Sequence, residues 1–130
     1  MLLTVLLMTS LLQIIAAIIA VESGGDPSAI GDNGAAFGAL QIHAAYVADA
    51  NAHSGNNWKH EDAFDTDVAI EIFKAYMSRY AVSSKTGQPI SAEIICRIHN
   101  GGPSGWKRDS TLPYWNKVKK ELLRQQQKGD

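Results

Sequence analysis

One carboxylate closes an otherwise apolar run, Ile14-Ile15-Ala16-Ala17-Ile18-Ile19-Ala20-Val21-Glu22-Ser23-Gly24-Gly25. Within it, the spacing i, i+3, i+4, i+7 of Ile15, Ile18, Ile19 and Glu22 predicts a helical stripe that ends in the acid. Gly24 and Gly25 then supply the left-handed backbone that stops a helix. Apolar neighbours and the negative end of the helix dipole both disfavour a charged carboxylate. The pattern therefore favours a general acid, although an ordinary exposed glutamate at a helix end fits it as well.

A second carboxylate follows in the turn Gly31-Asp32-Asn33-Gly34. A polar turn keeps its carboxylate solvated and hydrogen-bonded, hence ionised. The two carboxyl groups thus differ, because the environment of Glu22 favours its protonated form and that of Asp32 favours its charged form. Glycoside hydrolysis divides its catalytic roles between two such groups. Aspartate is also common in turns for local backbone bonding alone, and this alternative stays open for Asp32.

Composition indicates one soluble globular domain with a real core, since the chain has 130 residues and 45% hydrophobic residues. The formal net charge of -1 argues against nucleic acid as the main partner. The single cysteine, Cys96, excludes an intramolecular disulfide and is expected in the core. The four histidines lack zinc-ligand spacing and no cofactor fingerprint is present, so we predict neither a metal site nor a cofactor.

Residues 1–9 form an apolar N-terminal segment without the basic residues of a signal peptide. Together with the run to Val21 they are nearly long enough to span a bilayer. A signal remnant, a membrane-contacting anchor and the start of a buried first helix all stay open. Ser10 is an acceptable N-cap, so the functional helix is expected to begin there. We therefore predict a catalytic domain over residues 10–124 and a frayed polar tail over residues 125–130.

The rest of the sequence predicts a mostly helical α+β domain with one small β-hairpin. Asn33-Gly34 is a strong two-residue turn signal and centres the hairpin within residues 29–42. Loops are expected at residues 53–58 and 83–88, and Asn100-Gly101-Gly102-Pro103 should break a helix. Helices are expected at about residues 44–52, 67–80 with Asp65 or Thr66 as cap, 91–99 and 114–126.

Several ordered motifs resemble the lysozyme superfamily. Val21-Glu22-Ser23-Gly24-Gly25-Asp26-Pro27 and Phe37-Gly38-Ala39-Leu40-Gln41-Ile42 are similar to the helix end and strand that flank its sugar-binding cleft. Invertebrate-type lysozymes are cysteine-rich, whereas this chain has one cysteine, so it resembles a disulfide-free bacterial or phage branch. The segment between Glu22 and Gln41 is also slightly shorter than in those enzymes. The motifs most similar to the invertebrate type are Ile98-His99-Asn100-Gly101-Gly102-Pro103-Ser104-Gly105, Leu112-Pro113-Tyr114-Trp115 and the Tyr46-Val47-Ala48-Asp49-Ala50 stretch.

The resemblance implies a lysozyme-like fold whose hairpin lines the active-site cleft. It implies a muramidase that cleaves the β-1,4 bond between N-acetylmuramic acid and N-acetylglucosamine in peptidoglycan. Glu22 would be the general acid and base, and Asp32 would stabilise the transition state or act as nucleophile. The protein would act on glycan strands as a monomer, outside the cytoplasm or associated with a phage. Substrate-binding residues would be Ser23, Gln41, Ile42, His43, Tyr46, His99, Asn100 and Gly101.

Two other functions stay open. A lytic transglycosylase forms 1,6-anhydromuramic ends and would need Glu22 but not Asp32. A non-catalytic, envelope-associated glycan-binding protein would keep the fold without cleaving the substrate, although the intact Glu22 speaks against it.

Overall fold

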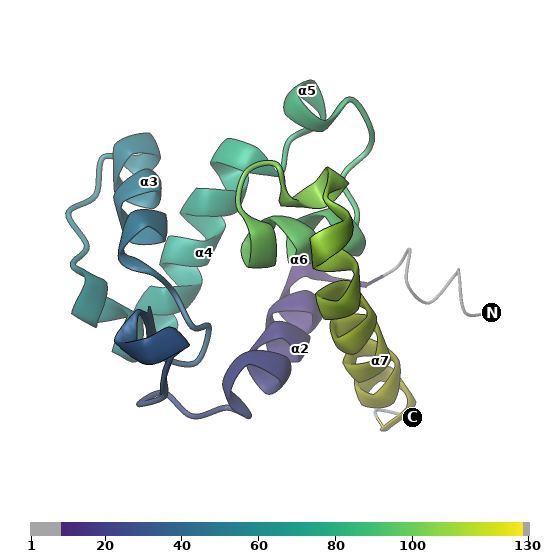
Figure 1. The fold of residues 1–130 in the computed structure, drawn as a ribbon, viewed down its shortest axis with the longest axis horizontal. Helices are drawn as coiled ribbons and strands as arrows, with labels where there is room; N and C mark the ends of the chain where they lie inside the picture. Colours follow the sequence, from purple (N-terminus) through teal and green to yellow (C-terminus); the bar gives the residue numbers. More distant parts are fainter. Residues whose placement is uncertain (1–8, 129–130) are drawn as a thin grey trace. The chain divides into compact units, whose positions relative to one another are not determined.

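The computed structural model describes residues 9–128, and the chain divides into two compact units. The first unit is drawn from Met1–Val21 and Tyr80–Asp130, and the second is Glu22–Arg79. Helix α2 (Leu11–Ser23), labelled in Figure 1, is the first described helix. It begins in the first unit, and its last two residues belong to the second. The predicted class, α+β and mostly helical with a small two-stranded hairpin, is confirmed.

Helix α2 begins at the predicted cap. The Ser10 hydroxyl accepts a hydrogen bond from the Gln13 N–H (3.2 Å), and the Gln13 side-chain oxygen accepts one from the Ser10 N–H (2.8 Å). This reciprocal pair is a capping box, which starts the helix through local contacts alone. The predicted left-handed stop is also confirmed, since the helix ends at Ser23 and is followed by Gly24 (φ 65°) and Gly25 (φ 92°).

One face of α2 is buried and the other is open. The exposed residues include Leu12, at 70%, and Leu11, at 40%. Ile19 and Glu22, at the C-terminal end of the predicted stripe, are half-buried. Among residues 9–128, no helix combines the length and apolar content needed to cross a bilayer. The alternatives offered for the N-terminal segment concern mainly residues 1–8, which lie outside the described part. The buried face consists of Ile14, Ile15, Ala17 and Ile18.

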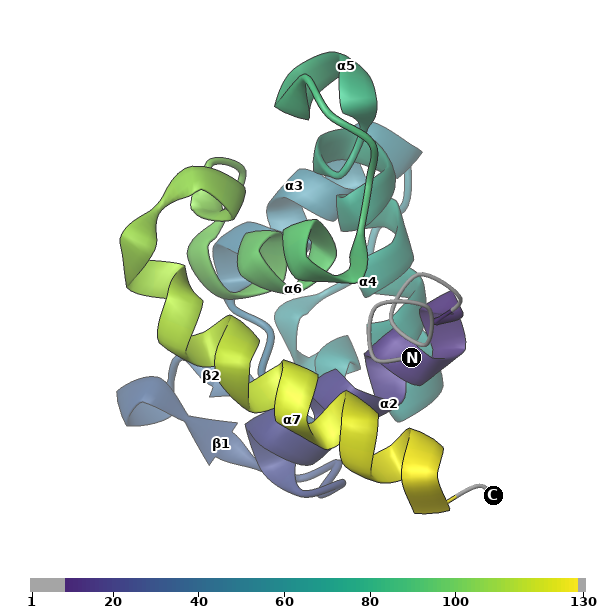
Figure 2. The same ribbon diagram turned by 90° about the vertical axis from the view of Figure 1, so that its right-hand side faces the viewer.

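In the first unit, helix α6 (Ala92–Gly101) packs against helix α7 (Leu112–Lys128), as Figure 2 shows. Two 3-10 turns, η3 (Gly105–Lys107) and η4 (Asp109–Thr111), join them. The Ser91 hydroxyl caps α6 by accepting a hydrogen bond from the Ile94 N–H (3.3 Å). Buried side chains of these two helices include Ile94, Cys96, Ile98, Trp115, Val118 and Leu122.

The connection between α6 and α7 is held by a buried cation. The Arg97 guanidinium, 8% exposed, donates from Nε to Thr111 Oγ1 (2.8 Å) and from Nη2 to the Arg108 carbonyl (2.8 Å). Its Nη1 donates to Glu93 Oε2 (2.7 Å), which compensates the charge. Thr111 Oγ1 lies 2.7 Å from the Gly105 carbonyl and donates to it. These bonds satisfy polar groups whose burial would otherwise be costly.

Two predictions in the first unit are wrong. Residues 83–88 contain the short helix α5 (Ser83–Thr86), closed by left-handed Gly87 (φ 73°), where we predicted a loop. Residues 125–128, predicted to fray, continue α7. Side-chain bonds support this last turn, because Gln125 Nε2 donates to Glu121 (3.2 Å) and Gln126 Nε2 donates to Thr9 Oγ1 (2.9 Å). Residues 129 and 130 lie outside the described part.

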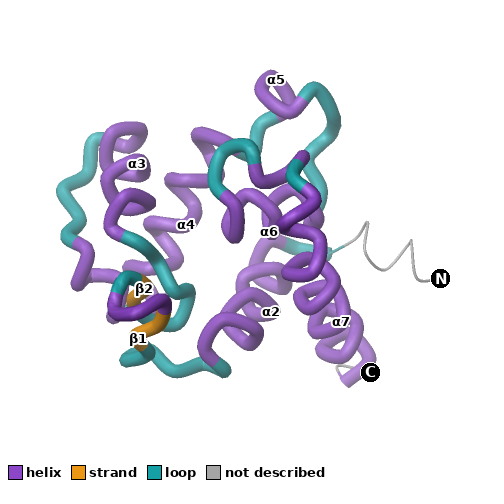
Figure 3. The backbone as a smooth tube through the Cα atoms, viewed as in Figure 1, coloured by secondary structure: helices purple, strands orange, loops and turns teal. Residues whose placement is uncertain are grey.

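The second unit combines the small sheet with two helices. Figure 3 shows strands β1 (Ile30–Gly31) and β2 (Ala36–Phe37) in orange. Helix α3 (Ala44–Ser54), the 3-10 turn η2 (His60–Phe64) and helix α4 (Thr66–Tyr80) follow. Of the two predicted caps of α4, Asp65 is the one used, since its Oδ1 accepts from the N–H groups of residues 67 (3.0 Å) and 68 (3.3 Å). Buried side chains include Leu40, Ile42, Val47, Ala69, Ile72, Phe73 and Met77.

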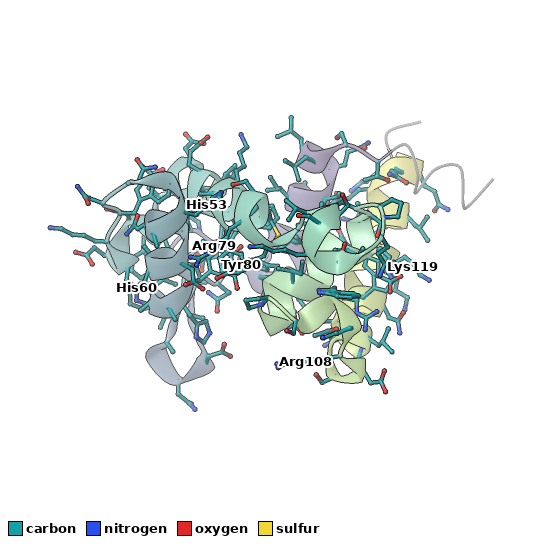
Figure 4. The ribbon with its side chains drawn as sticks, turned by 90° about the horizontal axis from the view of Figure 1, so that it is seen from above. His53, His60, Arg79, Tyr80, Arg108 and Lys119 are labelled. Atoms are coloured by element: carbon teal, nitrogen blue, oxygen red, sulfur yellow. The ribbon has the colours of Figure 1, made fainter. Side chains whose placement is uncertain are left out.

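Helices α3 and α4 are joined by two side-chain contacts. The Tyr46 and Tyr76 rings stack with centroids 3.7 Å apart and planes 7° apart. Arg79, labelled in Figure 4, reaches α3 with Nη1 3.3 Å from the Asp49 carbonyl and 3.7 Å from its Oδ1. The ring stack fixes the first turn of α3, which follows the hairpin directly.

Candidate active site

The hairpin turn places Asp32 at a sharp bend. Asn33 (φ 57°, ψ 36°) and Gly34 (φ 93°) have the positive φ values of the central residues of a type I′ turn. The Ala35 N–H donates to the Asp32 carbonyl (3.2 Å), and Gly31 pairs with Ala36 in the sheet. The predicted Asn-Gly hairpin turn is therefore confirmed.

Asp32 is itself left-handed, with φ 49°. Non-glycine residues rarely adopt such values, although aspartate and asparagine tolerate them better than others. Three successive residues are thus held in a conformation that most side chains resist. Backbone strain of this kind is typical of functional turns, which motivates a functional hypothesis for Asp32.

The Asp32 carboxylate has a defined partner on the other side of the hairpin. His43 Nε2 lies 2.7 Å from Asp32 Oδ2, while 48% of the His43 side chain and 69% of the Asp32 side chain remain exposed. His43 is the N-cap of α3, and its carbonyl accepts hydrogen bonds from the N–H groups of Tyr46 (3.1 Å) and Val47 (3.2 Å). The bond therefore ties the turn tip to the start of a helix.

Glu22 lies half-buried in the last turn of α2. Its neighbour Ser23 donates from Oγ to the Ala39 carbonyl (2.8 Å) and accepts from the Gly25 N–H (3.2 Å). Because Ala39 follows β2, this bond joins the helix end to the hairpin segment. Ser23, predicted to bind substrate, thus has a positioning contact.

Tyr46 connects the helix end with the start of α3 electrostatically. Burial raises the pKa of Tyr46 well above its ordinary value, and the nearby Tyr76 and Glu22 raise it further. The charge of Glu22 thus contributes, after burial and Tyr76, to the electrostatic environment of the Tyr46 phenol.

Gln41 and Ile42 support the hairpin. Gln41 is left-handed (φ 52°), and its Nε2 donates to the carbonyls of Ala29 (3.2 Å) and Gly38 (3.0 Å). Ile42 exchanges backbone hydrogen bonds of 2.9 and 3.0 Å with Phe37. The Ile42 side chain is 1% exposed, so it occupies the core, and the predicted sugar contact does not fit that side chain.

His60, which is not among the predicted site residues, supports this segment. Its ring stacks on Phe37 with centroids 3.7 Å apart and planes 6° apart, and its Nε2 lies 2.7 Å from the Ile42 carbonyl. Phe37 also stacks on Phe64 (4.5 Å). Figure 4 labels His60 in the second unit. No local sequence pattern predicts this contact, because the partners come from separate segments.

The remaining predicted site residues lie in the first unit, in the last turn of α6. His99 is buried, Asn100 is exposed and Gly101 is half-buried. The predicted break comes slightly later than expected, because α6 includes Gly101 and the residue with positive φ is Gly102 (85°). Asn100 is therefore helical and not the left-handed stop. Contact of His99, Asn100 and Gly101 with sugar stays a prediction.

Acidic and histidine side chains do not gather into a metal site in the described part of the chain. No group of three or more His, Cys, Asp or Glu residues there has an arrangement that would hold an ion. The predicted site residues that lie in the second unit include the carboxyl groups of Glu22 and Asp32, the His43 imidazole and the Tyr46 phenol.

Comparison with known proteins supports a common origin with lysozymes. The sequence model of the destabilase family matches residues 12–121. Lysozyme from Meretrix lusoria is 40% identical over 83 residues, or 64% of this chain and 65% of that protein. Lysozyme from Ostrea edulis is 37% identical over 84 residues, or 65% and 58% of the two chains. This chain thus spans less than two thirds of the length of these relatives.

Solved structures show the same fold. A chain in the crystal structure of Aeromonas hydrophila PliI in complex with Meretrix lusoria lysozyme matches with a TM-score of 0.71 and 35% identity, covering 83% of this chain and 87% of its own. Tapes japonica lysozyme matches with a TM-score of 0.68 and 29% identity, covering 82% and 85%. The lysozyme-like fold and the superfamily resemblance are confirmed.

Proposed function

This chain belongs to the destabilase family, and we propose that it is a muramidase that hydrolyses the β-1,4 bond between N-acetylmuramic acid and N-acetylglucosamine in peptidoglycan. The observation that supports this most is the contrast between its two carboxyl groups. Glu22 is half-buried at a helix end, whereas Asp32 is exposed and hydrogen-bonded to His43. Glycosidases use such unequal environments to give two carboxyl groups different roles.

In this mechanism Glu22 protonates the glycosidic oxygen as the bond breaks. Asp32 stays ionised and stabilises the oxocarbenium-like transition state or attacks the anomeric carbon. Glu22, having lost its proton, then activates the water that completes hydrolysis. Neither step needs a metal ion or an organic cofactor.

The location of the substrate indicates the location of the protein. Peptidoglycan glycan strands lie outside the cytoplasm, so we propose an extracytoplasmic or phage-associated protein that acts as a monomer. Its relatives are named lysozymes, which supports the same class of substrate for this chain.

Analysis of the products from purified peptidoglycan tests the proposal. Hydrolysis yields reducing N-acetylmuramic ends, which mass spectrometry distinguishes from the 1,6-anhydro ends of a lytic transglycosylase. Reducing ends that appear with the wild-type protein and disappear with Glu22→Gln support hydrolysis. Glu61→Gln, which changes an exposed glutamate of η2, is the matched control and should cleave normally. Anhydro ends would establish transglycosylation, and the absence of products would leave a glycan-binding protein.

A further inference from the structure

We propose that His43 is a positioning residue for Asp32, which orients one carboxylate oxygen so that the other faces the substrate. The inference rests on the proposed function, because it concerns how that mechanism keeps its second carboxylate in place. Two observations support it: the 2.7 Å contact between His43 Nε2 and Asp32 Oδ2, and the difference in how firmly the surrounding structure holds each of the two residues.

The backbone of His43 is rigidly supported. The preceding residue, Ile42, is 1% exposed and is bonded to Phe37 in both directions and to the His60 ring. The His43 carbonyl accepts the first hydrogen bonds of α3. The His43 side chain makes no capping bond to the described helix, although Ser, Thr, Asp and Asn usually cap with theirs. The imidazole is therefore available for Asp32.

The Asp32 side chain is much less restrained by its surroundings. It stands at the start of a type I′ turn, its side chain is 69% exposed, and packing alone does not select one rotamer at such a position. The bond to His43 spans 11 residues and supplies the missing restraint. A catalytic group must be held within about 0.5 Å of its productive position, normally through residues whose own rotamers are fixed.

Only one of the two partners can donate in this hydrogen bond. An ionised carboxylate only accepts hydrogen bonds, so His43 Nε2 carries the proton and donates it towards Oδ2. No hydrogen bond to Asp32 Oδ1 is found among residues 9–128, and this oxygen is left for the sugar. A role in stability alone would not explain this bond, because an exposed ion pair contributes little to the free energy of unfolding.

Kinetics of His43 variants test the proposal. His43→Ala should lower kcat by about 10- to 100-fold with KM nearly unchanged, the size expected for a misplaced reacting group. His43→Gln should recover part of the loss, since its amide can still donate. His53→Ala is the matched control, because His53 is an exposed histidine in the last turn of the same helix. Melting temperatures of all variants should remain close to that of the wild type.

A double-mutant cycle separates action through Asp32 from any independent effect. If His43 acts through Asp32, then His43→Ala should cost nothing further in an Asp32→Asn background. An unchanged kcat in His43→Ala, or losses that multiply in the double variant, would overturn the positioning role while leaving the muramidase proposal intact. A wild-type protein that releases no glycan fragments would overturn both, so the two failures are distinguishable.

Discussion

The Ser23 hydroxyl donates to the Ala39 carbonyl over 2.8 Å, and this bond links the helix end that carries Glu22 to the segment after β2. Both residues belong to the second unit. Since Glu22 is the neighbour of Ser23, the bond restrains the acid relative to the hairpin.

Removing this link should lower turnover more than stability. Ser23→Ala deletes the hydrogen bonds to the Ala39 carbonyl and from the Gly25 N–H, each worth about 1 kcal/mol in the free energy of unfolding. The kcat for glycan cleavage should fall more than this loss suggests, because Glu22 loses its restraint. Steady-state kinetics and thermal unfolding check both effects. Ser28→Ala, an exposed serine bonded only locally to Asp26, is the control, and equal effects from the two serines would contradict the prediction.

Glu22→Gln should abolish cleavage and leave the fold intact. General acid catalysis contributes about 10²–10⁴-fold, and the amide cannot donate a proton to a leaving oxygen. Release of soluble fragments from peptidoglycan measures the effect, and circular dichroism reports the fold. A variant that keeps most of its activity would refute the role of Glu22.

Core residues of α2 should matter far more than its exposed residues. Ile18 is 0% exposed, so Ile18→Ala should cost about 2–5 kcal/mol in the free energy of unfolding. Leu12 is 70% exposed, and Leu12→Ala should change stability by less than about 0.5 kcal/mol. Chemical denaturation of the pair measures the difference. Similar costs at both positions would show that the buried face of α2 is assigned wrongly.

Thr111→Val should destabilise the first unit. Valine keeps the volume but leaves Arg97 Nε without its acceptor and removes one of two donors to the Gly105 carbonyl, which keeps the Arg108 N–H. An unsatisfied buried polar group costs about 1–3 kcal/mol, and more when it is charged. Thermal unfolding should show a lower midpoint, whereas Ser110→Ala, at the exposed neighbour, should not.

Cys96 should be inert in the folded protein. Burial is the main cause that raises the pKa of its thiol, and the charge of Glu93 adds to the effect. Because the thiolate is the reactive form, a raised pKa leaves almost none of it at pH 8. A thiol-specific chromogenic reagent should therefore react only as the chain unfolds. Rapid labelling under native conditions would contradict the buried position.

The sequence predicted the features whose causes are local. The Ser10 cap, the glycine stop after Ser23 and the Asn33-Gly34 turn each depend on a few neighbouring residues, and all three are confirmed. The predicted helix at about residues 67–80 has a similarly local cause, because Ile72, Phe73 and Tyr76 recur at helical spacing and are buried in α4.

Contacts between distant segments cannot be predicted from local sequence patterns. Nothing near His60 in the chain indicates that its ring would stack on Phe37, and nothing near Arg97 indicates a bond to Thr111. The end of α7 was misjudged for the same reason, since its polar last turn bonds Thr9 through Gln126. Periodicity reports which side of a helix is apolar, but it does not identify a polar partner elsewhere in the chain.

The positive φ of Asp32 restricts how substitutions at this position can be interpreted. Asparagine tolerates the left-handed region about as well as aspartate, so Asp32→Asn removes the charge and keeps the backbone. Alanine lacks the short polar side chain that eases this conformation, and Asp32→Ala therefore alters the turn together with the chemistry. Glutamate keeps the charge but moves the carboxylate and strains the turn. Among these three replacements, only asparagine separates the contribution of charge from that of shape.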